Sequence, residues 1–348
     1  MVVAVGMMTA VGLTAAETAA SVDAGTAGFT ESAMLDQHFD PFTLAEVIDD
    51  GLPGLAEEVP DVKSLASRES RMLSLATMPL RECLAGMTKS EQTPSLCLAL
   101  PESQTRLPLD AVKFLERLTG QTEAAFESNG SECTRQGRAG GLLAVGDACA
   151  KIAKGESKFV IAGGVDTYRD PYVLGTLDMQ KRVKLVQNMD GFIPGEGAAF
   201  LLLSSRDAVR EFGLAPLARL SPVTEGFEEG HLASEEPYKG EGLAETLEKL
   251  FEENDVEEAI RDVYSSMNGE NHWAKEWGVA FTRNGAHFDP DHQIHHPADC
   301  FGDTGAACGL LLTGLAALDV AQGNGHGPAV VYCSSDYGPR AALAVLSP

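Results

Sequence analysis

The sequence has few basic residues. Of its 348 residues, 26 are Lys or Arg and 51 are Asp or Glu, so the formal net charge is −25 at pH 7. Binding to nucleic acid or to an anionic membrane depends on clustered cations, which a chain of this balance does not supply. We therefore expect no nucleic-acid partner and no membrane partner, and we expect any charged protein partner to be basic.

Sequence patterns of metal and cofactor sites are missing as well. The seven cysteines are scattered without a CxxC pair, so they indicate neither a zinc cage nor a disulfide framework. No GxxxxGK[ST] loop occurs, and the glycines of GFIPGEGAA do not follow the order of a dinucleotide-binding motif. We expect no cofactor and no bound metal.

The apolar N-terminus lacks the positive charge of a secretory signal, because the first basic residue of the chain is Lys63. No apolar stretch reaches the length that we expect of a membrane span. Together with the scattered cysteines, these features predict a cytoplasmic protein.

Two segments repeat one order of elements. Residues 137–168 and 302–336 each contain a small-residue helix, a polar turn and a β-branched strand. Both helices are apolar around most of their circumference, which is typical of helices buried on all sides. Each half has three more predicted strands. In the first half they lie near residue 2, at 95–101 and at 197–205, and in the second near residue 216, at 261–269 and at 341–347.

This repeat predicts the fold class. Strands that alternate with helices favour mostly parallel sheets covered on their faces. A helix that is apolar all round must lie between two sheets, so two copies predict an α/β fold with five layers, α/β/α/β/α. We expect two pseudo-symmetric halves, residues 1–213 and 214–348, with a helical outer-layer insertion at about 28–94.

One segment is strongly acidic. Residues 225–262 contain 14 acidic and 3 basic side chains, with Leu243, Leu247, Leu250 and Phe251 at helical spacing. The pattern predicts a solvated helix with one buried stripe, and an interaction surface for a basic partner is the alternative.

Four segments resemble the thiolase superfamily, and its β-ketoacyl synthase branch in particular. They are ACAKIAKGESKFVIAGGVD at 148–166, DGFIPGEGAAFLLLSSRDAVREFG at 190–213, FGDTGAACG at 301–309 and SSDYGPRAALAVL at 334–346. The resemblance covers most of the chain, and its most specific part is DGFxxGEGA together with AGGxD. It implies a five-layered thiolase-like fold.

The resemblance also implies where a catalytic site would lie. Ketosynthases use one Cys at the head of the first buried helix, which receives the acyl chain, and two His, which stabilise the developing enolate. When the family's motifs are aligned with this sequence without gaps, the position of the Cys falls on Arg138. The His positions fall on Asn268 and Asp303, and a Lys that precedes the second His falls on Ala298. All four residues differ from those of the family.

These substitutions oppose condensation, so we expect no catalytic residues at these positions. A guanidinium stays protonated and is not a nucleophile. Asp303 would place negative charge where an oxyanion develops, and Asn268 does not exchange a proton near neutral pH. A buried Arg at a helix N-terminus opposes the helix dipole and needs a partner. We therefore expect Arg138 to pair with Asp303, together with Asn268, and to close the former active-site cavity.

Two further features carry structural expectations. We expect Gly195 and Gly197 to allow a tight turn, and Glu196 to hold that turn by accepting hydrogen bonds from backbone N–H groups. Thiolase-fold proteins dimerise edge to edge, and the resemblance assigns this role to the strand at 158–166. It implies a homodimer or a heterodimer through Phe159, Val160, Ile161, Ala162, Gly163 and Gly164.

Other residues allow alternative chemistry. Cys133 is a candidate for a displaced nucleophile, but no base stands near it in the sequence, which favours an unreactive loop thiol. We expect Cys149, inside the first buried helix, to be a packing residue. A further group consists of candidate metal ligands: His287, His292, His295 and His296, with Asp289, Asp291, Asp299 and Asp303. Their spacing is not that of HExxH, which favours a polar loop beside the former acyl tunnel.

Two functional hypotheses follow. The first is a catalytically degenerate ketosynthase-like protein that acts as a binding partner, scaffold or chaperone component. It would resemble a chain-length-factor subunit or a thiolase-like protein of type VI secretion effector loading. The alternative is an active acyltransferase of the 3-oxoacyl-ACP synthase type that uses other residues and binds an acyl thioester or acyl carrier protein.

Overall fold

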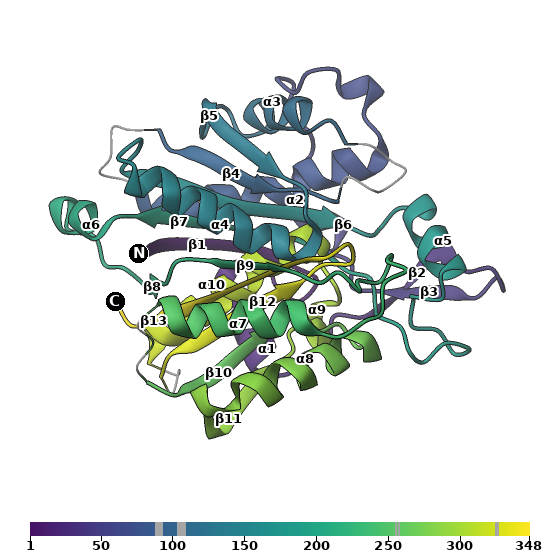
Figure 1. Ribbon diagram of the computed structural model, residues 1–348. Coiled ribbons are helices and arrows are strands. Elements are labelled where there is room, and N and C mark those ends of the chain that lie inside the picture. The colour runs from purple at the N-terminus through teal and green to yellow at the C-terminus, as the bar shows by residue number, and fades with distance from the viewer. Residues whose placement is uncertain (88–92, 103–108, 255, 257, 324–326) are drawn as a thin grey trace.

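Two mixed β-sheets form the frame of the molecule (Figure 1). The computed structural model describes the chain except for residues 88–92, 103–108, 255, 257 and 324–326. The first sheet has the order β1 (Val2–Thr9), β7 (Glu196–Ser204), β6 (Phe159–Thr167), β4 (Ser95–Ala99), β5 (Glu127–Thr134). The second has the order β11 (Phe288–His295), β10 (Ile260–Ser265), β12 (Ala329–Ser334), β13 (Pro339–Leu346), β8 (Arg219–Leu220), and β9 (Thr224–Phe227) also pairs with β13.

Two helices lie between these sheets. They are α4 (Gly137–Ala153) and α10 (Cys308–Gln322), which pack against each other and against strands of both sheets. Most residues of both helices are buried, as expected for helices that are apolar on all sides. The predicted strands at 95–101, 197–205, 261–269 and 341–347 correspond to β4, β7, β10 and β13.

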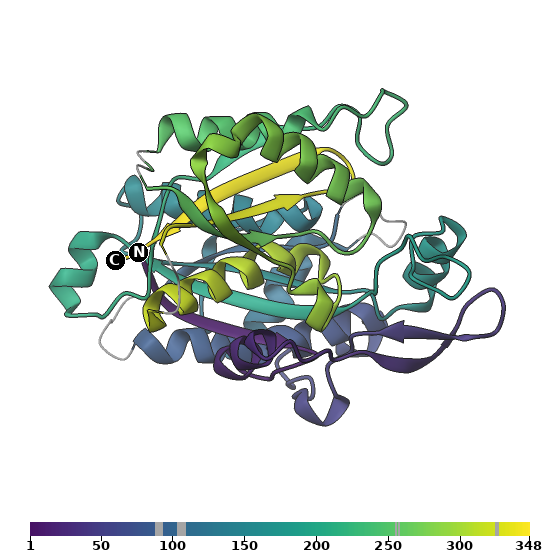
Figure 2. The ribbon, with the colours of Figure 1, turned by 90° about the horizontal axis from the view of Figure 1, so that it is seen from below.

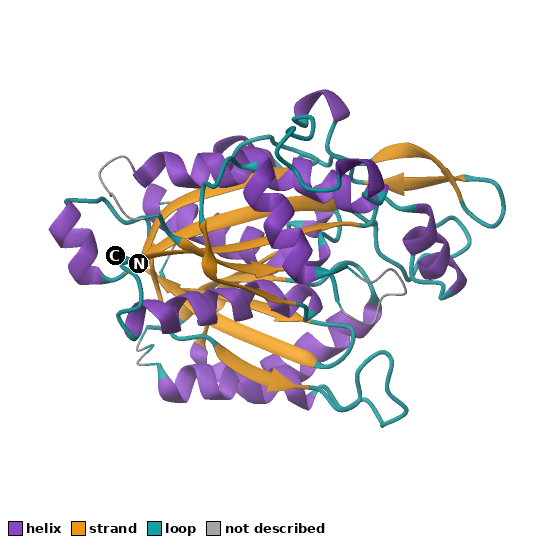
Figure 3. Cartoon of the chain, turned by 90° about the horizontal axis from the view of Figure 1, so that it is seen from above, coloured by secondary structure: helices purple, strands orange, loops and turns teal. Residues whose placement is uncertain are grey.

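Helices also cover the outer face of each sheet. On the first sheet, α2 (Ser67–Leu84) packs on β1, β6 and β7, and α3 (Ala111–Gln121) packs on α2 and β5. On the second, α7 (Glu241–Glu253) packs on β9 and β13 beside α8 (Asn271–Asn284). Figure 3 shows the two groups of strands with helices between and outside them. The predicted five-layered α/β/α/β/α architecture is therefore confirmed.

The outer layer differs from the prediction for residues 28–94. Among the described residues of this range, only α2 is a long helix. Residues 30–44 form a hairpin of β2 (Thr30–Leu35) and β3 (Pro41–Leu44), which projects from one end of the molecule (Figure 3). The Asp36 carboxylate accepts hydrogen bonds from the backbone N–H groups of His38 and Asp40, which stabilises the turn. Phe42 and Leu44 pack against Leu174 and Leu177 of α5 (Pro171–Met179), so tertiary packing selects the strand conformation.

The opening of the second half also differs from the prediction. The single strand expected near residue 216 is replaced by the short strands β8 and β9, which both pair with β13. The expected boundary at residue 213 falls in the connection between α6 (Arg206–Phe212) and β8, and this division stays a prediction. Both termini lie on the same side of the molecule (Figure 2).

One described helical segment, Gly305–Gln322, is long and apolar enough to span a membrane by length and composition. The sequence-based statement that no stretch reaches this length is therefore wrong. Seventy-two per cent of this segment is buried inside the protein, because it forms the inner helix α10.

The acidic segment contains the helix that its hydrophobic spacing predicts. In α7, Leu243, Leu247, Leu250 and Phe251 are buried and face the second sheet, while the glutamates at 245, 248, 252 and 253 are exposed. The predicted helix with one buried stripe is confirmed.

Glycines set the distance between the two inner helices. A Cβ atom on Gly141 of α4 would lie 2.9 Å from the backbone nitrogen of Leu310 and 3.0 Å from Cα of Gly309, both on α10. A Cβ atom on Gly146, one and a half turns further along α4, would meet Val223 at an ordinary 3.5 Å. The two helices therefore approach each other backbone to backbone at Gly141 and Gly309, close to the candidate functional site.

We predict that Gly141→Ala lowers the free energy of unfolding by about 1–3 kcal/mol, because the methyl group must push the inner helices apart. Gly146→Ala is the matched control, and it should be neutral or stabilising by up to about 1 kcal/mol through helix propensity. Chemical denaturation of both variants tests this difference. Equal stability of the two variants would show that the inner helices are not in backbone contact.

Candidate functional site

The site lies at the head of α4, where the chain turns sharply. Gly137 has φ of +58°, and a side chain there would collide with the carboxylate of Glu102, so glycine is required. Arg138 follows as the second residue of the helix. The backbone N–H of Ala139 donates to the Ser335 hydroxyl at 2.9 Å, so a residue of the second half caps this helix.

Arg138 is buried, with 3% of its surface exposed. Its Nη1 lies 3.2 Å from Oδ2 of Asp303, its Nη2 donates to Oδ1 of Asp336 at 2.7 Å, and its Nε donates to the Ser334 carbonyl at 3.1 Å. Its guanidinium also stacks on Trp273, 4.6 Å from the ring centroid. Burial alone would lower the pKa of Arg138, but the charges of Asp303 and Asp336 outweigh it and raise that pKa.

The predicted pair of Arg138 and Asp303 is therefore confirmed, and Asn268 belongs to it. Asn268 donates from Nδ2 to Oδ2 of Asp303 at 2.8 Å, and the other carboxylate oxygen of Asp303 accepts from the backbone N–H of Gly305 at 2.9 Å. All three side chains are buried. Ala298 stands apart from them, at the start of the short helix α9 (Ala298–Phe301), and does not line the pocket described below.

Three charged residues of the site were missed by sequence reasoning: Arg182, Glu270 and Asp336. Arg182 donates to both carboxylate oxygens of Glu270, at 2.8 and 2.7 Å, and its Nη1 lies 2.5 Å from Oδ2 of Asp336. Glu270 also accepts from Nε1 of Trp273. Arg182 and Asp336 are 154 positions apart in irregular segments, where no local pattern indicates a contact.

A second buried pair adjoins this network. Arg68 of α2 donates from Nη2 to Oδ1 of Asp166 at 2.8 Å and from Nε to the Thr167 carbonyl at 2.9 Å. The Asp166 carboxylate also accepts the backbone N–H of Ala306 at 3.0 Å, which links the end of β6 to the segment before α10.

Two carboxyl groups near Arg138 have opposite pKa shifts. Burial by itself raises the pKa of Asp336, but the charges of Arg138 and Arg182 outweigh it and lower the pKa to about 2. Burial, reinforced by the charge of Asp336, raises the pKa of Glu102 to about 8. Asp336 is therefore a fixed anion at neutral pH, whereas Glu102 changes its charge near neutral pH.

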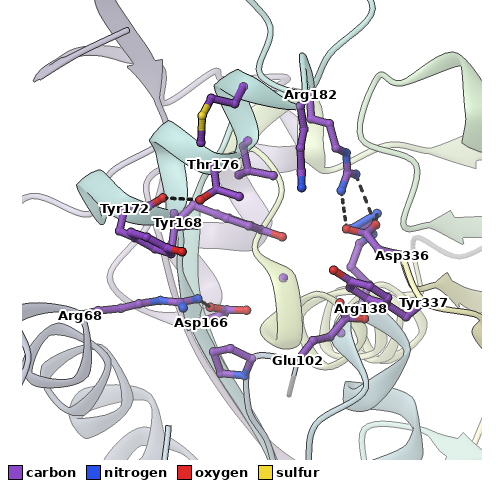
Figure 4. A pocket seen from close by; sticks show the side chains of 17 residues that line it. Arg68, Glu102, Arg138, Asp166, Tyr168, Tyr172, Thr176, Arg182, Asp336 and Tyr337 are labelled. Atoms are coloured by element: carbon purple, nitrogen blue, oxygen red, sulfur yellow. Dashed lines mark hydrogen bonds and ion pairs between the residues drawn. The ribbon is translucent and has the colours of Figure 1, made fainter. Parts of the chain in front are cut away.

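The Arg138–Asp303 pair does not close the cavity, which corrects the prediction. A pocket of about 500 Å³ remains beside Arg138 (Figure 4). It is lined by charged residues from both halves, by the tyrosines at 168, 172 and 337, and by residues of α5. The pair fails to fill the space because Asp303, Asp336 and Trp273 draw the guanidinium against the second half.

Glu196 is the main residue that holds the segment GFIPGEGAA, residues 191–199, in position. This side chain is buried and accepts the backbone N–H of Val47 at 2.8 Å, so the predicted backbone hydrogen bond is present, although it comes from a distant segment. Its carboxylate is also paired with Arg71 at 2.5 Å. Gly195 and Gly197 are needed for close approach, since a Cβ would lie 2.3 Å from the Phe301 carbonyl and 2.8 Å from the Met8 carbonyl, respectively.

The prediction that the strand at 158–166 forms an exposed edge for dimerisation is wrong. Residues 159–167 form β6, which is hydrogen-bonded to β4 on one side and to β7 on the other, and all nine residues are buried. Phe159, Val160, Ile161, Ala162, Gly163 and Gly164 therefore cannot pair with another chain. The edges of the first sheet are β1 and β5, and β5 is polar and partly exposed.

The His- and Asp-rich segment is a strand and not the expected loop. Residues 288–295 form β11, at the edge of the second sheet beside β10. His295 pairs through Nε2 with Asp262 at 2.8 Å, and His292 Nδ1 lies 2.8 Å from the Asp289 carbonyl. Within the described part of the chain, no three His, Cys, Asp or Glu side chains are grouped as metal ligands would be.

The other candidate thiols are not activated. Burial raises the pKa of Cys133 to about 12, and its thiol contacts the Ala111 carbonyl at 3.8 Å. Burial also raises the pKa of Cys149. Both shifts oppose thiolate formation.

This five-layered arrangement, in which two buried helices pack against each other between two sheets, defines a thiolase-like fold. Residues 125–208 match the family "Beta-ketoacyl synthase, N-terminal domain". The structure is similar to the ishigamide ketosynthase/chain length factor, with a TM-score of 0.79, 15% identity, and coverage of 100% of this chain and 98% of that chain.

Two other solved structures are similar to this one. One is the ketosynthase from module 6 of the bacillaene synthase of Bacillus subtilis 168, with a TM-score of 0.79, 13% identity, and coverage of 100% of this chain and 72% of that chain. The other is a type II PKS acyl-carrier protein in complex with its ketosynthase bound to the hexaketide, with a TM-score of 0.77, 13% identity and coverage of 100% and 98%. No curated protein matches the chain in sequence. The comparisons therefore show a thiolase-like ketosynthase fold over the whole chain and a match to the ketosynthase family over residues 125–208.

We predict that Arg138→Met lowers the free energy of unfolding by about 3–5 kcal/mol, because it leaves the buried carboxylates of Asp303 and Asp336 without their shared cation. Arg81→Met is the control. It removes an exposed pair with Glu123 and should change stability by at most about 1 kcal/mol. Adding Asp303→Asn to Arg138→Met should recover part of the loss. Additive losses in the double variant would argue that the two residues do not interact.

The lowered pKa of Asp336 predicts an acid-dependent stability. Because the pKa is below its usual value in the folded state, the contribution is present above pH 3.8 and is lost as pH falls toward about 2. Asp336→Asn should therefore be less stable than wild type at pH 6, and the gap should narrow by about 2 kcal/mol between pH 4 and pH 2. Urea titrations along this series measure it, and a gap independent of pH would contradict the assignment.

Proposed function

We propose that the protein is a catalytically inert ketosynthase-like subunit that acts by binding a protein partner, in the manner of a chain-length factor. The observation that carries the proposal is the guanidinium at the head of α4. Arg138 occupies the position at which the family resemblance places the nucleophilic Cys, and it is tied to Asp303 and Asp336. A buried cation clamped in this way has neither the lone pair nor the freedom to attack a thioester.

The rest of the site supports the same interpretation. Asp303 stands where the resemblance places a His, and its negative charge opposes an enolate or oxyanion. None of the described residues that line the pocket is a Cys or a His. The thiols of Cys133 and Cys149 have raised pKa values, which opposes their use as displaced nucleophiles.

The proposed partner is a protein. Among the similar structures are a ketosynthase/chain length factor and a ketosynthase in complex with an acyl-carrier protein. The net charge of −25 favours a basic partner, and β5 offers a polar sheet edge for homodimer or heterodimer formation in the cytoplasm. The same features would suit an adaptor of a multi-protein system such as type VI secretion effector loading.

We predict that the pure protein shows neither acylation nor turnover with octanoyl and malonyl thioesters. Intact-protein mass spectrometry detects a covalent acyl group, and gas analysis detects decarboxylation. An active bacterial ketosynthase run in parallel is the positive control. Turnover that is abolished by Arg138→Ala, Asn268→Ala or Asp303→Ala would overturn the proposal and would favour an acyltransferase with unusual residues.

A further inference from the structure

One end of the molecule carries a small lobe with its own core. The hairpin of β2 and β3 lies there beside α5 and the turn that follows α5 (Figures 1 and 3). We call residues 30–44 and 171–192 the end lobe. The backbone N–H of Gln37 in the hairpin donates to the Asp178 carboxylate of α5 at 2.9 Å, so the two parts are joined. The core of the lobe consists of Phe42, Leu44, Leu174, Leu177, Val183 and Phe192.

The outer surface of the end lobe is apolar. Of the twelve large hydrophobic side chains that are exposed in the described part of the chain, six belong to this small lobe. Apolar side chains that gather on one part of a soluble protein mark an interaction surface, whereas single ones scattered over the surface do not. The six are Leu35, Phe39, Tyr172, Met179, Val186 and Met189.

Tight turns hold two of these side chains outward. Phe39 has φ of +67° in the hairpin turn and is 82% exposed. A bulky residue is strained in this left-handed conformation, so the turn itself would be better formed by glycine. Val186 is 90% exposed at the tip of a second turn, in which Leu185 and Asn188 exchange two backbone hydrogen bonds of 3.0 Å. The folding of the lobe therefore does not explain why an aromatic side chain stands at position 39.

The exposed charges of the end lobe are separated by sign. The hairpin carries Glu31 and Asp40, and the segment after α5 carries Lys181 and Lys184. Within the part of the chain that the structure describes, none of these four side chains forms an ion pair. The remaining exposed carboxylate of the segment, Asp190, accepts a backbone N–H at the start of α8. The lobe thus presents an acidic half and a basic half side by side.

This separation of charge fits a second copy of the same chain. In a two-fold symmetric contact the hairpin of one copy meets the α5 segment of the other, and the reverse contact forms as well. Each acidic half then faces a basic half, and the apolar turns are covered. Two chains with a net charge of −25 repel each other, so a surface that has its own unpaired cations is where they can approach.

We propose that the protein forms a two-fold symmetric dimer through the end lobe, with Phe39 as the apolar anchor. The carboxylates of each hairpin face Lys181 and Lys184 of the other copy. The strand β5, which is proposed above as an edge for a partner, lies away from the end lobe (Figure 1). The inference therefore goes beyond the proposed function, because it gives the protein a surface for self-association that is separate from that edge.

Analytical ultracentrifugation of the full chain from about 1 to about 100 µM tests this contact. We expect a reversible equilibrium between monomer and dimer. Phe39→Gly should weaken dimerisation at least about tenfold, yet keep or raise the thermal unfolding midpoint of the monomer, because glycine adopts this φ without strain. Val112→Ser, at a 69% exposed position of α3, is the matched control and should dimerise as wild type does. A monomer at every concentration would overturn the proposal, as would a dimer that Phe39→Gly does not weaken.

Charge reversal tests the pairing of the two halves. Lys181→Glu combined with Lys184→Glu should weaken the dimer at least about tenfold, because like charges then face each other. Adding Glu31→Lys and Asp40→Lys restores opposite signs and should recover most of the affinity. Failure of the fourfold variant to recover would contradict the proposed arrangement, provided that its thermal unfolding midpoint shows that it is folded.

The control for charge reversal is Lys249→Glu combined with Lys275→Glu, which makes the same change in net charge on the exposed surface of α7 and α8. Its dimer affinity should stay within about threefold of wild type, and a loss as large as that of the lobe variant would contradict the proposal. All of these variants keep Arg138 and its carboxylates. A monomeric protein would therefore leave the proposed function standing, whereas turnover in the thioester assay would remove that function without affecting the dimer.

Discussion

The structure depends on one buried cation at the head of an inner helix. The positive end of the α4 dipole repels the guanidinium of Arg138, and burial removes its hydration, so Arg138 is tolerated only where anions surround it. Those anions, Asp303 and Asp336, come from the second half, as do Ser334, which accepts a hydrogen bond from Arg138, and Trp273, which stacks on it. The charge therefore ties the two halves together at the heads of the inner helices.

The surrounding fold explains why these charged residues occur together. The inner helices meet backbone to backbone near Gly141 and Gly309, so the side chains at their heads lie within one small volume. A buried cation at one head needs an anion at the other, and Asp303 supplies it. Asp336 and Arg182 extend the pairing outward to Glu270. Removal of any one member leaves an unpaired charge in a low-dielectric environment, which is why such networks change together.

The same network shapes the pocket. Because Arg138 is drawn against Trp273 and the carboxylates of the second half, it leaves space on the side of α5. The arginines around this space are paired with the carboxylates of Asp166, Asp336 and Glu270.

The sequence by itself determined the layered fold, because the all-round apolar pattern of residues 137–153 and 308–322 permits only helices buried between sheets. It also placed Arg138, Asn268 and Asp303 at one site, through the resemblance of the flanking motifs. The tertiary structure alone decided that β6 is a central strand, that residues 30–44 form a hairpin, and that Arg182, Glu270 and Asp336 complete the network. The physical reason is distance along the chain. Local periodicity reports burial within one element, whereas strand order and pairing between charges 88 and 154 positions apart depend on how distant elements pack.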